Sequence, residues 1–110
     1  MDLAFLEGYT QGDRATTLEI LRDFRDTTRV DIAGLRPAAD RSGMVDLMRG
    51  AHRIKGASAM VGARALSEAA ESLEAKARAG EALPAFEALA AVESAFAQVD
   101  RFTAQEIEKG

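Results

Sequence analysis

The apolar residues of this chain recur at steps of three and four over nearly its whole length. That spacing matches the 3.6-residue period of an α-helix and places the apolar side chains on one face of each helix. Four long segments show it, at about 14–37, 44–61, 63–79 and from Leu83 or Pro84 to near the end. No segment alternates with period two for long enough to predict a strand, so the sequence predicts an all-α protein.

Short turn signals separate these segments. A first short helix is expected from Asp2 to about Gly8; "YTQGD" then breaks it, and Asp13 can cap the second helix by accepting backbone N–H bonds. Pro37 should end or kink that helix, because proline lacks the N–H and clashes one turn back. The remaining turns are expected at "DRSG" (40–43), at Gly62, and at Gly80, which suits a left-handed residue after a helix.

Four amphipathic helices joined by short turns bury their apolar faces best as an antiparallel four-helix bundle, here with a short extra N-terminal helix. The 110 residues suffice for one core, so we predict a single domain over residues 1–110. The initial methionine and the lack of a linker favour a complete protein. The predicted core residues are Leu18, Leu21, Phe24, Thr28, Ile32, Leu35, Leu47, Ala51, Ile54, Ser58, Val61, Ala63, Leu66, Ala70, Leu73, Ala77, Phe86, Leu89, Val92, Phe96 and Val99.

Composition narrows the classes of function. The net charge of −4 argues against nucleic acid as the main partner. There is no apolar run long enough to span a membrane and no signal-peptide pattern at the start. The absence of cysteine excludes disulfides and thiolate metal sites. These features lead us to expect a cytoplasmic protein with no membrane or metal site.

The single histidine lies in "AHRIKGASAMVGA", residues 51–63. At 100° per residue, His52 falls about 130° from the centre of the apolar stripe, so we expect it to be exposed. It is surrounded by Arg49, Arg53 and Lys55, which form a basic spot on an acidic protein. Metal binding would need more ligands, and the nearest preceding acid, Asp46, is on another face of the helix. A phosphoryl acceptor needs only an open path and nearby cations, but spacing alone also allows a surface histidine without a role.

Gly56 lies one turn after His52, on the same side of the helix. Glycine inside a helix costs roughly 1 kcal/mol relative to alanine, so the residue needs an explanation. Close approach of another helix, simple tolerance, or clearance for a partner at His52 would each account for it. Gly50 raises the same question in the same helix, and the sequence leaves these alternatives open.

The segment from His52 to Ser58, His-Arg-Ile-Lys-Gly-Ala-Ser, resembles the signature of histidine-containing phosphotransfer (HPt) domains. Gly62-Ala63 and then Leu66, Leu73 and Glu74 extend the resemblance downstream, and residues 12–24 are similar to the family's first long helix. Ala57 departs from the pattern, since many members have serine there. The resemblance implies a four-helix bundle, often with an extra N-terminal helix.

The resemblance also implies a function. His52 would accept a phosphoryl group on Nε2 from the aspartyl phosphate of a receiver domain and pass it to another receiver, in bacterial two-component signalling. Lys55 would pair with the phosphoryl oxygens, and Gly56 would let the receiver's loops approach. Such a chain is a phosphocarrier without catalytic machinery or a cofactor of its own, because the receiver supplies Mg²⁺ and acidic residues. The absence of an orienting carboxylate near His52 agrees with that role.

The expected partners are response-regulator receiver domains and a hybrid histidine kinase. Met48, Ala59 and Met60 are expected to contact a receiver, with Arg49 and Arg53 around them. A kinase hairpin that dimerises usually carries an H-E motif, whereas Arg53 follows His52, so we expect a monomer. Two alternatives remain: the phosphoacceptor domain of a chemotaxis-type histidine kinase, and a bundle that binds receivers without phosphoryl transfer.

Overall fold

The computed structural model describes residues 1–110 and contains five helices and no strands. The helices are α1 (Leu3–Thr10), α2 (Arg14–Asp40), α3 (Met44–Met60), α4 (Arg64–Arg78) and α5 (Ala82–Lys109). The predicted all-α class is therefore confirmed. None of these helices combines the length and the apolar character needed to cross a membrane.

The turn chemistry of the sequence accounts for several helix boundaries. The Asp13 side chain accepts hydrogen bonds from the backbone N–H groups of Ala15 and Thr16 and so caps α2, as predicted. Gly62 and Gly80 follow α3 and α4 with φ of 73° each, a left-handed conformation that glycine adopts without steric cost.

Of the two effects predicted for Pro37, an end or a kink of the helix, the first is wrong, because α2 continues to Asp40. Proline's φ is already close to the helical value, and the ring removes only one N–H, near the end of the helix. The turn that follows satisfies the last carbonyls of the helix: Arg41 N–H donates to the Pro37 carbonyl, and Gly43 N–H donates to the Ala38 carbonyl at 2.8 Å.

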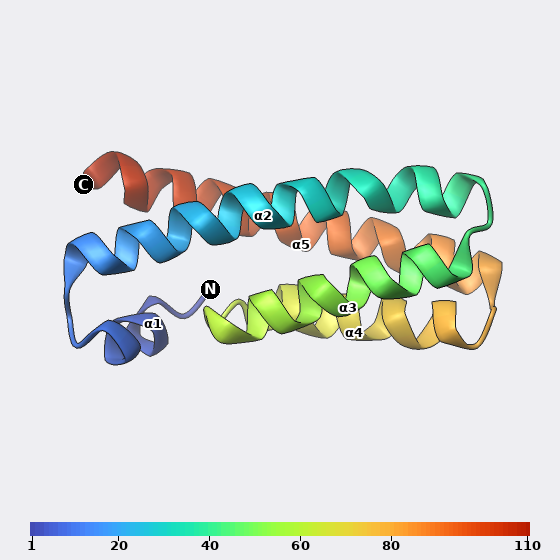
Figure 1. The fold of residues 1–110 in the computed structure, drawn as a ribbon, viewed down its shortest axis with the longest axis horizontal. Coiled ribbons are helices and arrows are strands. Elements are labelled where there is room, and N and C mark those ends of the chain that lie inside the picture. Colours follow the sequence, from blue (N-terminus) through green and yellow to red (C-terminus); the bar gives the residue numbers. More distant parts are fainter.

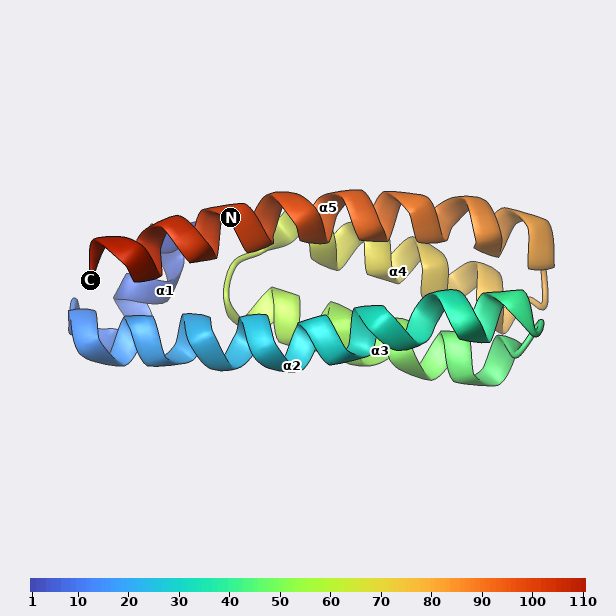
Figure 2. The same cartoon turned by 90° about the horizontal axis from the view of Figure 1, so that it is seen from above.

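The four long helices lie along the longest axis of a molecule that measures 43 × 20 × 17 Å (Figure 1). In Figure 1, the chain runs back and forth along this axis from α2 to α5. α2 packs against α3 and α5, and α4 packs against the same two helices. α2 and α5 extend past α3 and α4 at one end, where α1 lies against α2 (Figures 1 and 2). The start of the chain is tied to the turn after α3, because Asp2 N–H donates to the Gly62 carbonyl at 3.0 Å.

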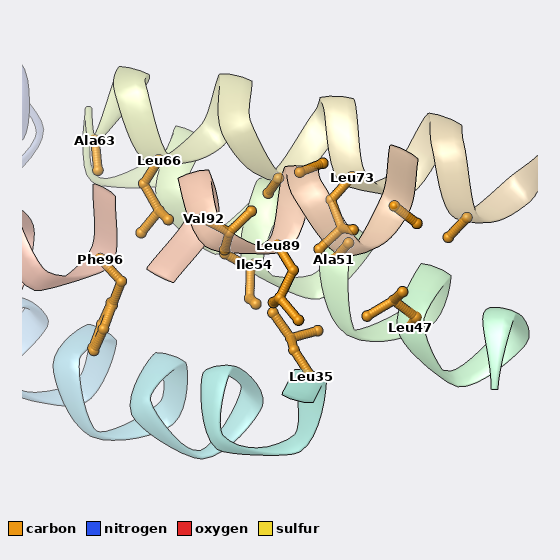
Figure 3. Packing of buried hydrophobic residues seen from close by; sticks show 14 of the residues in the cluster. Leu35, Leu47, Ala51, Ile54, Ala63, Leu66, Leu73, Leu89, Val92 and Phe96 are labelled. Carbon is orange, nitrogen blue, oxygen red and sulfur yellow. The ribbon is translucent and has the colours of Figure 1, made fainter. Parts of the chain in front are cut away.

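The core follows the predicted apolar stripes closely. Leu35 of α2, Ile54 of α3 and Leu89 of α5 converge in the centre of the bundle (Figure 3). All but two of the residues predicted for the core are buried. Of the two exceptions, Ile32 is half-buried and still packs against the core.

The other exception is Phe86, which is 42% exposed, so the prediction that it lies in the core is wrong. The apolar stripe of α5 reaches back from Leu89 by four residues to Ala85, which is fully buried, rather than by three to Phe86. The Phe86 ring lies instead under the guanidinium of Arg36, 4.8 Å from its carbon, in a cation–π contact.

The two glycines of α3 have different surroundings. A Cβ added to Gly50 would lie 2.9 Å from Cδ2 of Leu35, whose side chain is buried in α2. A Cβ added to Gly56 would meet nothing within 4 Å. Close helix packing therefore explains Gly50 but not Gly56.

This difference predicts opposite effects of the same substitution. Gly56→Ala should stabilise the protein by about 1 kcal/mol, because alanine is the better helix former and nothing obstructs it. Gly50→Ala gains the same helix propensity but overpacks against Leu35, so it should be less stable than Gly56→Ala by about 1–3 kcal/mol. Urea unfolding of both variants measures the difference, and equal stabilisation would contradict the close contact.

Candidate functional site

His52 lies on the outer face of α3, and its side chain is 70% exposed, as helical geometry predicts. The imidazole makes its protein hydrogen bond through Nδ1 alone, with Oε2 of Glu74 at 2.7 Å. Nε2 has no partner in the protein. One ring nitrogen is thus held and the other is open to an incoming group.

Glu74 overturns the expectation that no carboxylate orients His52. It comes from α4, and its side chain is only 4% exposed, so a carboxylate lies beneath the exposed ring. Glu74 follows His52 by 22 residues and lies in another helix, so the residues of α3 alone do not indicate this contact. A signal was nevertheless present, because Glu74 stands four residues after Ala70 and three before Ala77, within the buried stripe. A charged residue at a buried position is expected to have partners.

Two cationic side chains bind the same carboxylate. Lys55 Nζ donates to Oε1 at 3.4 Å, and Arg78 donates to Oε2 at 2.9 Å. Burial raises the pKa of Glu74, but the hydrogen bonds from His52 and Lys55 and the charge of Lys55 outweigh it, so the pKa lies below its ordinary value of 4.5. Glu74 is therefore ionised at neutral pH.

The charge on Glu74 determines which imidazole nitrogen carries the proton. An ionised carboxylate can only accept hydrogen bonds, so Nδ1 of His52 must be the donor. In the neutral ring the lone pair is then on Nε2, the nitrogen without a protein partner. This arrangement presents a nucleophile at an exposed nitrogen. No group of three or more potential metal-ligating residues is present anywhere in the structure.

A cleft of about 350 Å³ lies beside His52, between α3 and α4. It brings together three residues predicted for the site, Met48, Arg49 and Arg53, and adds Glu74 and Arg78. Arg53 donates to Asp31 of α2 at 3.1 Å, whereas Arg49 makes no ion pair.

Ala59 and Met60 lie farther along α3, in a different surface. They line an apolar groove of about 590 Å³ with Phe5 and Tyr9 of α1 and several residues of α2. Met60 is 72% exposed and Tyr9 is 77% exposed. The residues predicted to contact a receiver are thus divided between the cleft and the apolar groove. The sequence did not indicate that α1 contributes to this surface, because that depends on how α1 folds back on α2.

Comparison with known proteins agrees with this geometry. The family model described as the Hpt domain matches residues 19–102, which is most of the chain and includes His52, Lys55, Gly56 and Glu74. The chain therefore belongs to the Hpt domain family, as its resemblance to HPt domains predicted. No curated protein and no solved structure matches it.

The His52–Glu74 contact predicts the tautomer of the ring. In the wild type, ¹⁵N NMR of the neutral imidazole should show the proton on Nδ1, because Glu74 accepts it. Glu74→Ala should shift the population toward the Nε2-protonated form. Glu71→Ala, which removes an exposed carboxylate of the same helix, should leave it unchanged. A wild-type ring protonated mainly on Nε2 would contradict the inferred hydrogen bond.

Proposed function

We propose that this protein is a phosphorelay intermediate of a two-component system. His52 accepts a phosphoryl group on Nε2 from the aspartyl phosphate of one receiver domain and passes it to another. Membership of the Hpt family supports histidine phosphotransfer as the general activity. The observation that carries the proposal is the exposed imidazole with Nδ1 held by Glu74 and Nε2 unpartnered.

The transfer step follows from this arrangement. The Nε2 lone pair attacks phosphorus, and the bond between phosphorus and the aspartyl oxygen breaks, so the receiver regains a free carboxylate. The ring becomes a phosphorylated imidazolium, whose positive charge is paired with Glu74. Onward transfer reverses these bonds on a second receiver, and the Nδ1 proton stays in place throughout. Because Glu74 is already charged and in contact, the site needs little reorganisation as the charge develops.

Lys55 and Gly56 serve the same step. The Lys55 ammonium and the His52 ring bind the same carboxylate, Glu74, and therefore lie close together. The Lys55 side chain is 37% exposed, so it can reach phosphoryl oxygens on Nε2. Charge-assisted hydrogen bonds of this kind are stronger than neutral ones. Gly56 leaves open space one turn from His52, which gives the loops of a receiver access to the ring.

The chain acts as a phosphocarrier rather than an enzyme, and it carries no cofactor. The receiver supplies Mg²⁺ and the acidic residues of the reaction. Arg49 and Arg53 face that acidic centre, which favours fast association through charge complementarity. Met48 packs at the edge of the same contact, and the apolar groove at Ala59 and Met60 extends it toward α1.

We further propose the setting of this activity. Residues 1–110 form a single domain, an antiparallel four-helix bundle of α2–α5 with α1 as the extra helix, and the protein works as a cytoplasmic monomer. A hybrid histidine kinase supplies phosphoryl groups through its receiver. The ring of contacts among α2, α3, α4 and α5 supports the bundle assignment.

The first test is phosphotransfer from a radiolabelled receiver to the wild type and to His52→Gln. The wild type should gain acid-labile, base-stable label, and His52→Gln should gain none, because the nucleophile is absent. Equal labelling of the variant would refute the assignment. Labelling only by the ATP-binding domain of a kinase would favour the chemotaxis-type alternative, and binding of receivers without labelling would favour an adaptor.

The second test concerns clearance at Gly56. Gly56→Leu should fold, because leucine is the better helix former, yet lose about tenfold to a hundredfold in transfer rate, since the side chain displaces the receiver. Ala90→Leu is the matched control, because it adds a leucine at an exposed position of α5. Normal transfer by Gly56→Leu would show that the clearance argument is wrong.

A further inference from the structure

The cleft beside His52 carries positive charges that the transfer step does not use. Three arginines line it, Arg49 and Arg53 from α3 and Arg78 from the last position of α4. Glu74 is the only acidic residue in its lining. The side chain of Arg78 is 63% exposed, so it can move without disturbing the core.

The three arginines differ in how far their charges are compensated. Arg53 is bound to Asp31 at 3.1 Å, and the Asp31 side chain is only 16% exposed. Arg49 makes no ion pair, and Asp46, one turn away, is bound by Arg41 at 2.8 Å. Arg49 acts on Asp46 through its charge alone, so its guanidinium has no carboxylate partner in direct contact and can bind an anion at the cleft.

Arg78 shares its partner. Glu74 carries one negative charge and is bound by two cationic side chains, Lys55 and Arg78, in addition to His52. Arg78 and His52 Nδ1 bind the same oxygen, Oε2, so the guanidinium lies within two hydrogen-bond lengths of the ring. One carboxylate cannot neutralise two cations, and the surplus charge faces the cleft.

We propose that Arg49 and Arg78 form an anion subsite that binds a phosphate-sized dianion next to Nε2 of His52. Arg49 stands one turn before His52 and Lys55 one turn after it, so the two cations flank the ring on opposite sides. The subsite would hold the phosphoryl group against the protein from the side opposite Lys55. Its role in a relay rests on the proposed function, but its affinity for phosphate does not.

Inorganic phosphate is the direct probe of the subsite. Titration of the wild type should shift the His52 imidazole resonances, and Arg49→Gln/Arg78→Gln should weaken phosphate binding by about three- to tenfold, the range for exposed charge-assisted contacts. Arg22→Gln/Arg101→Gln is the matched control, because it removes the same charge at two exposed arginines without ion pairs. Arg49→Gln alone leaves the Glu74 contacts intact and should show part of the loss. Equal weakening in the control, or none in the double variant, would overturn the proposal.

Phosphoramidate extends the test to a reaction without a receiver. Its P–N bond breaks, ammonia leaves, and the phosphoryl group bonds to Nε2. The proton stays on Nδ1, in its hydrogen bond to Glu74. The double variant should raise the phosphoramidate concentration that gives the half-maximal rate of His52 phosphorylation by about three- to tenfold, with a smaller change in the maximal rate constant. An unchanged half-maximal concentration would count against the subsite. If phosphate binds as expected but no receiver transfers to His52, the proposed function fails and the subsite stands. If a receiver transfers to His52 but phosphate binding does not depend on Arg49 and Arg78, the subsite alone is rejected.

Discussion

The site depends on one buried carboxylate. Glu74 lies between α3 and α4, and a charge at that depth is tolerated only because three groups bind it. The same contacts orient the imidazole, place the lysine and hold the Arg78 guanidinium beside the cleft. The packing of α3 on α4 is thus a condition for the chemistry, since a shift of either helix would separate the ring from its counter-charge.

Local periodicity was enough to predict most of the fold. Leu47, Ile54 and Leu73 stand at helical spacing among similar residues, and burial of one such residue implies burial of the next. Phe86 failed this rule because steps of three and four are equally helical, and only the position of α5 against its neighbours selects Ala85. Pro37 left the end of α2 open for a comparable reason: a proline removes its own N–H bond, and the turn that follows it determines where the helix ends.

The site was predictable only in part. Exposure of His52 follows from its angle to the apolar stripe, but its contact with Glu74 requires the register of two antiparallel helices, which a single helix does not contain. The difference between Gly50 and Gly56 likewise depends on Leu35, a residue of another helix. Contacts between residues of different helices depend on how the helices pack, and the spacing of residues within one helix carries little information about them.

The tie between Asp2 and Gly62 has a consequence for how this surface can change over evolution. It anchors α1 beside the end of α3, so that Phe5 and Tyr9 form a wall of the apolar groove while contributing little to the main core. Substitutions on that wall would alter the shape of the groove without touching the His52–Glu74 pair. The outline of this face and the reactivity of the imidazole can therefore diverge independently among related chains.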